Sequence, residues 1–147
     1  MKLTDNLTEN ALVWEKAGFK LPLFNRDLVI EETRKNPQWI HFGAGNIFRA
    51  FPAAVHQSLL DQGLAVAGII VAEGFDYEII DKVYKPYNDL SVLIVLKSNG
   101  TIEKKVIGSV VESLKADSSS SHWLRLQEIF ASPSLQMASF TITEKGY

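Results

Sequence analysis

The stretch that determines the fold is Gln38-Trp-Ile-His-Phe42-Gly43-Ala44-Gly45, an apolar run that ends in two glycines separated by one residue. Such a run is typical of a buried strand that breaks into a tight turn. The following residues, about Asn46–Gln62, predict a helix that ends at Gly63. Because Pro52 falls inside it, we expect a short first turn over 46–50 and a main helix that begins at Pro52. Its buried face is predicted to contain Phe48, Phe51, Val55, Leu59 and Leu60.

Further apolar runs continue the pattern along the chain. Residues 67–72 are almost entirely apolar, as in strands of a parallel sheet that is covered on both faces. Two runs, 90–96 and 102–111, flank Ser98-Asn99-Gly100-Thr101, which predicts a hairpin with a type I′ turn. A last strand is predicted over 137–143. Helices are predicted over 76–84 and 122–130, the second capped by a serine of the preceding loop.

A glycine turn between a strand and a helix is how many α/β proteins hold the pyrophosphate of a dinucleotide. The first glycine allows the turn, the second lets the backbone approach the phosphates, and the start of the helix offers free N–H groups. The pattern therefore predicts a cradle formed by Gly43, Ala44, Gly45, Asn46 and Ile47. Phe48 replaces the third glycine of the usual fingerprint, and a purely structural turn is the alternative.

Residues at strand ends complete the predicted site. Glu73 closes the second strand, where an acid bonds the adenosine ribose and repels a 2′-phosphate, so NAD is the expected cofactor; Asp76 is the alternative acid. Arg49 is predicted to pair with phosphate, or equally with a surface carboxylate. Thr143 and Glu144 end the last strand, at the edge where ligands gather, although a plain edge position is the alternative.

Strands separated by helices predict an α/β fold: a Rossmann-like doubly wound, mainly parallel sheet with a β-hairpin insertion. Residues 1–37 are predicted to form a peripheral segment, with short helices over 11–17 and 27–35. Residues 38–147 are predicted to form the dinucleotide-binding domain. The sequence stops after a strand that would lie centrally in such a sheet, so we expect this domain to be truncated.

Composition narrows the function further. The 147 residues contain no cysteine and carry a net charge of −2, which gives no reason to expect nucleic acid as a partner. No apolar run approaches the roughly 20 residues that span a bilayer, and no signal peptide is apparent, so we expect a cytoplasmic protein without membrane contact. His41, His56 and His122 lack metal-ligand spacing, so no metal is expected. His41 is expected to be a hydrogen-bonded core residue.

Three segments together resemble the amino-terminal part of the long-chain mannitol dehydrogenase family. They are His41-Phe-Gly-Ala-Gly-Asn-Ile-Phe-Arg-Ala50, Lys105-Val-Ile-Gly-Ser-Val-Val111 and Thr141-Ile-Thr-Glu-Lys-Gly-Tyr147. They occur in the order of that family, with the predicted hairpin before the second. The resemblance runs from about Leu21 to Tyr147, and the family shares the departure at Phe48.

The resemblance implies a zinc-independent, NAD(P)-linked oxidoreductase, and the acid at Glu73 favours NAD. It would interconvert a polyol or hexonate, such as mannitol or D-mannonate, with fructose or D-fructuronate. In the family the catalytic lysine, with Asn and His, lies in a later helical domain, so no catalytic residue is expected here. The fragment alone is expected to be inactive and to self-associate. Residues 73–77 match mannitol dehydrogenases weakly, which favours a uronate-pathway enzyme. The alternative is a non-catalytic nucleotide-binding or assembly module.

Overall fold

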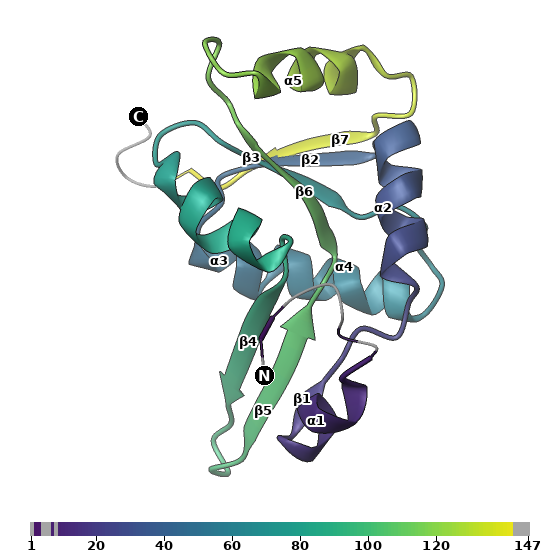
Figure 1. Cartoon of the computed structure of the whole chain (residues 1–147), viewed down its shortest axis with the longest axis vertical. Helices are drawn as coiled ribbons and strands as arrows, with labels where there is room; N and C mark the ends of the chain where they lie inside the picture. The colour runs from purple at the N-terminus through teal and green to yellow at the C-terminus, as the bar shows by residue number, and fades with distance from the viewer. Residues whose placement is uncertain (1, 4–6, 8, 143–147) are drawn as a thin grey trace.

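The computed structural model describes residues 2–3, 7 and 9–142, and a four-stranded parallel sheet forms its centre (Figure 1). The strands lie in the order β6 (Val110–Lys115), β3 (Ile69–Glu73), β2 (Trp39–Phe42) and β7 (Met137–Phe140). Numbered along the chain within this sheet, the order is 3-2-1-4. These are the first four positions of the 3-2-1-4-5-6 order of dinucleotide-binding folds. The predicted Rossmann-like parallel sheet is confirmed.

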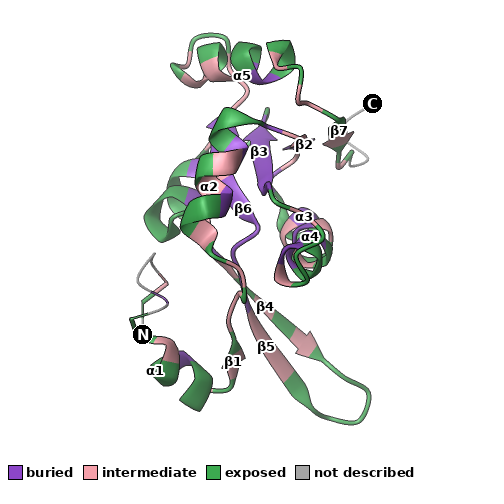
Figure 2. Ribbon diagram, turned by 90° about the vertical axis from the view of Figure 1, so that its right-hand side faces the viewer, coloured by how far each residue is buried: buried purple, intermediate pink, exposed green. Residues whose placement is uncertain are grey.

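Helices lie on both faces of this sheet (Figure 2). One face carries α3 (Asn46–Ala50), α4 (Pro52–Asp61) and the short helix η2 (Ile80–Tyr84), which continues into η3 (Lys85–Tyr87). The other face carries α2 (Arg26–Lys35) and α5 (His122–Ala131). Burial on both faces explains why the β3 segment is apolar at almost every position.

Alternate residues of β3 pack into two separate apolar clusters. Ile69 and Val71 pack with Phe48 on the α3 side, whereas Ile70 and Ala72 pack with the α5 side. All five residues of β3 are buried. This alternation follows from the period of two residues in a strand.

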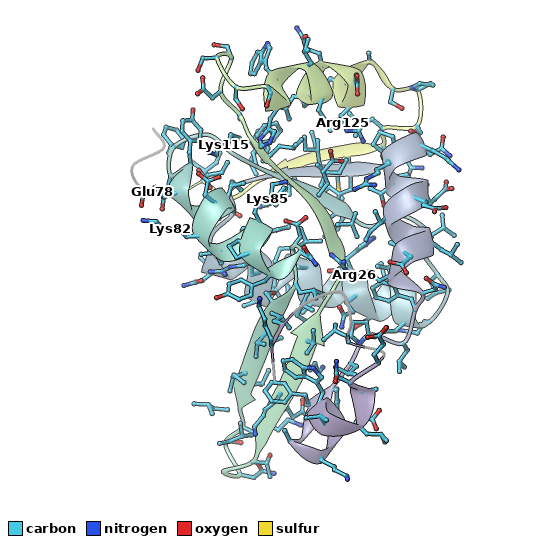
Figure 3. All side chains as sticks on the ribbon, viewed as in Figure 1. Arg26, Glu78, Lys82, Lys85, Lys115 and Arg125 are labelled. Carbon is cyan, nitrogen blue, oxygen red and sulfur yellow. The ribbon has the colours of Figure 1, made fainter. Side chains whose placement is uncertain are left out.

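A polar contact ties α5 to the sheet and to α2. Arg125 of α5 (labelled in Figure 3) donates to both carboxylate oxygens of Glu112 in β6, at 3.0 and 3.1 Å. It also donates to the carbonyl oxygen of Arg34, at 3.2 Å. The planar guanidinium therefore fixes three elements at once.

The predicted hairpin is present as β4 (Ser91–Leu96) and β5 (Ile102–Ile107), and it projects away from the parallel sheet (Figure 1). Its predicted turn type is wrong, because Gly100 has a positive φ of 80° and Asn99 does not. The Gly100 N–H donates to the Lys97 carbonyl oxygen at 2.9 Å, and the Lys97 N–H donates to Thr101 at 2.9 Å. The result is a three-residue loop with a left-handed glycine at its end.

The amino-terminal segment packs on the hairpin. The short strand β1 (Phe19–Lys20) pairs with β5 in parallel, and α1 (Ala11–Lys16) places Trp14 in a cluster with Val106. The helix α2 begins at Asn25, whose side chain accepts from the Leu28 N–H at 3.2 Å. The domain boundary at residue 37 stays a prediction.

The predicted strand over 102–111 is two strands. The chain leaves the hairpin at Ile107 and enters the parallel sheet at Val110. Gln57 of α4 binds the backbone between these two strands. Its side-chain amide donates to the Val106 carbonyl oxygen at 2.8 Å and accepts from the Gly108 N–H at 2.6 Å. Gly108 and Ser109 interrupt the apolar pattern at this corner, and the prediction of a single strand passed over this break.

Pro52 begins a second helix, as predicted, but the predicted buried face is wrong in part. Phe51, Val55 and Leu59 are exposed. The buried residues of α4 are Ala53, His56, Gln57 and Leu60. The break at Phe51 turns this face, and two polar residues lie inside because they bond buried backbone groups. His56, for example, contacts the Ala67 carbonyl oxygen at 2.7 Å.

The last predicted helix is present as α5, but its first turn is capped differently from the predicted way. The Ser121 side chain does not cap α5; instead the Ser120 hydroxyl accepts from the His122 N–H at 3.2 Å. Of its apolar residues, Leu126 and Ile129 are buried, whereas Trp123 and Phe130 are exposed. Within the described part of the chain, no helix has the length and apolar character needed to cross a membrane.

Candidate nucleotide-binding site

The glycine turn joins β2 to α3, and its two glycines have different surroundings. Gly43 has a positive φ of 112°, and a Cβ built there would lie 3.2 Å from both the Cβ and the carbonyl oxygen of Thr141. Gly45 precedes α3 with an ordinary φ of −73°. A Cβ on Gly45 would meet nothing within 4 Å. Gly43 is therefore required by the fold, whereas the fold alone does not require Gly45.

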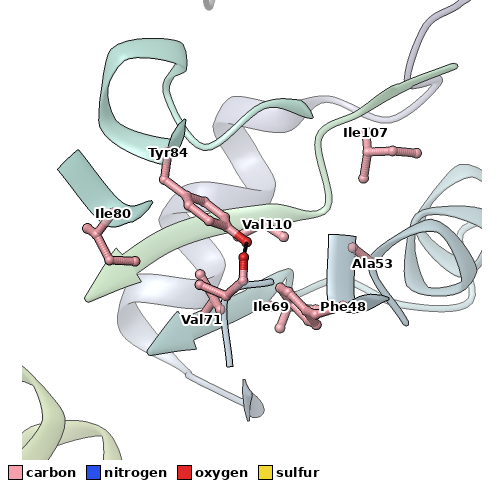
Figure 4. Packing of buried hydrophobic residues seen from close by; sticks show 9 residues of the cluster. Phe48, Ala53, Ile69, Val71, Ile80, Tyr84, Ile107 and Val110 are labelled. Carbon is pink, nitrogen blue, oxygen red and sulfur yellow. Dashed lines mark hydrogen bonds between the residues drawn. The ribbon is translucent and has the colours of Figure 1, made fainter. Parts of the chain in front are cut away.

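Two side chains from other elements hold Ala44, which is fully buried. The Ala44 N–H donates to Oε2 of Glu73 at 2.8 Å, and the Tyr84 hydroxyl donates to the Ala44 carbonyl oxygen at 2.9 Å (Figure 4). Burial raises the pKa of Tyr84, so its hydroxyl keeps the proton that it donates. Nothing in the sequence motif pointed to Tyr84, which lies forty residues further along the chain.

Glu73 is an internal part of the site. Its second carboxylate oxygen accepts from the N–H groups of Gly74 and Phe75, each at 3.0 Å. Only 8% of the residue is exposed. The carboxylate thus links the end of β3 to the glycine turn through backbone donors. Asp76, the alternative acid, is exposed.

A hollow of about 380 Å³ lies where the start of α3, the loop after β3 and η2 meet. It is lined by Gly45, Asn46, Arg49, Asp76, Glu78, Ile79, Lys82 and Val83. Glu78, just before η2, forms an ion pair with Lys82 of η2 (Figure 3). The structure thus brings four of the residues considered from sequence, Gly45, Asn46, Arg49 and Asp76, to one hollow. Gly43, Ala44, Ile47 and Glu73 do not line it.

Arg49 has an incomplete set of partners. One terminal nitrogen donates to the Asn46 side-chain oxygen, and the guanidinium carbon lies 5.8 Å from the centre of the Tyr84 ring. Its Nε is buried and has no hydrogen-bond partner among the described residues. A buried donor without an acceptor is unfavourable, and an anionic ligand would supply one.

His41 is a hydrogen-bonded core residue, as predicted. Its Nδ1 lies 2.8 Å from the Ser139 hydroxyl and its Nε2 lies 2.9 Å from the Thr141 hydroxyl. The ring stacks on Phe48 with the centroids 4.2 Å apart. Burial lowers the pKa of His41 and keeps the ring neutral near pH 7. Thr141 is not among the predicted site residues, although it follows the same strand as Thr143 and Glu144.

Two predicted site residues, Thr143 and Glu144, lie outside the described residues, so their roles stay predictions. Within residues 2–3, 7 and 9–142, no group of three or more metal-ligating side chains occurs.

A parallel sheet in the order 3-2-1-4, a glycine turn after its first strand and an acid at the end of its second define a Rossmann-type nucleotide-binding unit. Over all 147 residues the chain is 52% identical to D-mannonate oxidoreductase of Thermotoga maritima, and it spans 27% of that protein. The predicted resemblance to the amino-terminal part of the long-chain mannitol dehydrogenase family is confirmed.

Solved structures agree with this match. All of the chain superposes on 28% of Pseudomonas fluorescens mannitol 2-dehydrogenase, a ternary complex with NAD and D-mannitol, with a TM-score of 0.78 and 28% identity. D-sorbitol dehydrogenase in substrate-free form matches with a TM-score of 0.79 at 24% identity, again over 28% of its chain, which supports the fold. No family model matches the chain.

Proposed function

We propose that this chain is the NAD-binding part of an oxidoreductase that interconverts a hexonate or polyol with its ketone. D-Mannonate and D-fructuronate are the first substrates to test, because the match to D-mannonate oxidoreductase covers the whole chain at 52% identity. The observation that carries nucleotide binding is the open space at Gly45 beside the partnerless Nε of Arg49. Mannitol 2-dehydrogenase, in complex with NAD, supports the choice of cofactor.

The residues at the hollow fit the parts of a dinucleotide. The N–H groups of Gly45, Asn46 and Ile47 stand at the start of α3, and Arg49 adds positive charge for the phosphates. Ala44 contributes through its position, because Glu73 already accepts from its N–H. We assign the ribose to Asp76, which lines the hollow, and give Glu73 the role of holding the loop.

NAD, when bound, would supply the hydride acceptor for oxidation of the carbinol carbon. The residues of this chain would bind and orient it. We place the general base in the part of the longer protein that these 147 residues do not cover, as the resemblance implies, and we assign the role to none of the lysines here.

Cofactor preference tests the role of Asp76. The exposed carboxylate would repel a 2′-phosphate, so we expect NAD to bind more tightly than NADP. Asp76→Ala should narrow that gap and leave the melting temperature unchanged. Glu73→Gln is the matched variant: it should lower the melting temperature, because Glu73 accepts backbone hydrogen bonds in the fold. A wild-type preference for NADP would contradict the assignment.

Gly45→Val tests the site as a whole. The branched side chain enters open space in the protein but would occupy the approach to the phosphates. We expect NAD affinity in calorimetric titration to fall by more than about tenfold, while the free energy of unfolding changes by less than about 0.5 kcal/mol. Equal losses of affinity and stability would show that the turn is only structural.

A further inference from the structure

A line of hydrogen bonds crosses from β2 to β7 and ends beside the glycine turn. The indole N–H of Trp39 donates to the Ser139 hydroxyl at 2.7 Å, which lies 2.8 Å from Nδ1 of His41. Nε2 of His41 then lies 2.9 Å from the Thr141 hydroxyl. Parallel pairing sets His41 opposite Ser139, so the register of the two strands builds this line.

The chemistry of these groups sets the direction of the protons. Trp39 can only donate, so Ser139 accepts from it. Among the described residues, the one acceptor recorded near the Ser139 hydroxyl proton is Nδ1 of His41. If Ser139 donates to Nδ1, the neutral ring carries its proton on Nε2 and donates to Thr141. The Thr141 oxygen then accepts from His41, and nothing in the described part of the chain accepts its own proton, which can bond a group outside the line.

Thr141 lies next to the glycine turn, outside the hollow at the start of α3. Thr141 directly follows β7, and its N–H donates to the Phe42 carbonyl oxygen at 2.9 Å. Thr141 packs closely against Gly43, where a Cβ would lie 3.2 Å from the Thr141 Cβ. From β2 the chain continues to β3 and then to β6 on one side of β2 in the sheet. The next strand, β7, lies on the opposite side of β2, so the strand order reverses at β2. Ligands of open α/β sheets bind where the strand order reverses in this way.

We propose that the Thr141 hydroxyl donates a hydrogen bond to an oxygen of the nicotinamide half of the dinucleotide. His41 and Ser139 act as positioning residues for that proton. The inference rests on the proposed function. The adenosine half is assigned to the β3 side, at Asp76, and the phosphates to the start of α3. Thr141 stands on the opposite side of β2 from β3, which leaves it the other half of the ligand.

Calorimetric titration of Thr141→Val and Thr141→Ser with NAD, ADP-ribose and ADP tests the contact. Valine keeps the shape but removes the hydroxyl, so we expect NAD to bind roughly 3- to 10-fold more weakly, with affinity restored by serine. ADP should bind all three proteins equally. A loss shared by ADP-ribose would place the acceptor in its distal ribose or phosphate, and a loss confined to NAD would place it in the nicotinamide.

Unchanged NAD affinity in Thr141→Val, or an equal loss for ADP, would overturn the contact. A wild-type chain that binds none of the three ligands would overturn the proposed function, and this contact with it. The proton direction has a test of its own without ligand, namely the ¹⁵N chemical shifts of the His41 ring. We expect a neutral ring protonated at Nε2, and protonation at Nδ1 would overturn the assignment. Thermal melts of both variants identify any loss of folding.

Discussion

Gly43 and Gly45 are two residues apart, yet only one of them is demanded by the protein's own geometry. The motif predicted that Gly43 allows the turn and that Gly45 allows close approach of a ligand. Gly43 has a positive φ, whereas Gly45 has an ordinary φ and open space beside it. What the motif could not show is how the residue between them is held. The partners of Ala44 come from Glu73 and Tyr84, and such long-range contacts leave no local pattern in a sequence.

Gly43→Ala should destabilise the protein by about 1–3 kcal/mol, because a non-glycine residue at a φ of 112° is strained and its Cβ crowds Thr141. Gly45→Ala is the matched control and should change the free energy of unfolding by less than about 0.5 kcal/mol. Urea denaturation measures both. Similar stabilities for the two variants would argue against the strain at Gly43.

At the scale of elements, the strand, turn and helix around residue 45 were predictable, and so was the break at Pro52. These features are local: an apolar run, glycines, and a proline that suits a first helical position. The corner between β5 and β6 has a local signal in Gly108 and Ser109, but no local pattern identifies Gln57, which satisfies its backbone from another element. The polar buried face of α4 was missed for the same reason.

Gln57→Leu should remove both of these hydrogen bonds and leave the Val106 carbonyl and the Gly108 N–H buried without partners. At about 1–3 kcal/mol for each unsatisfied group, we expect a loss of roughly 2–4 kcal/mol in the free energy of unfolding. Ser58→Ala, an exposed change on the same helix, is the control and should be nearly neutral. A leucine variant as stable as the wild type would show that the corner does not depend on Gln57.

For the molecule as a whole, burial lowers the pKa of His41, His56 and His122. The unfolded chain takes up protons near the ordinary value of 6.5, where the native state does not. The contribution of these neutral histidines to the free energy of unfolding is therefore fully present above pH 6.5. It falls as the pH drops below that value. Burial raises the pKa of Asp89, so this residue favours the folded state more at low pH and opposes the effect of the histidines.

The loss of stability at low pH is best measured by comparing the wild type with a histidine variant. We expect His56→Gln to lose less stability than the wild type when the pH is lowered from 7.5 to 5.5 in chemical denaturation. Parallel slopes for the two proteins would exclude His56 as a source of the pH dependence.

The sheet ends at β7, whose outer edge is unpaired within the described residues, and Phe140 and Ile142 there are each 60% exposed. Unpaired edges and exposed apolar groups favour association. We expect the 147-residue chain to self-associate in light scattering, and Phe140→Glu to reduce the association. Leu23→Glu, at a residue that is 82% exposed and away from this edge, should have no effect. A monomeric wild-type chain would refute the expectation.

The double anchoring of Ala44 has a kinetic consequence. A loop whose central N–H and carbonyl are already engaged has little conformational entropy left to lose when a ligand arrives. The turn is preorganised, so capture of the nucleotide needs no slow closing step at this point. Rapid-mixing experiments should then show one binding phase whose rate rises linearly with ligand concentration, as in encounter with a rigid surface.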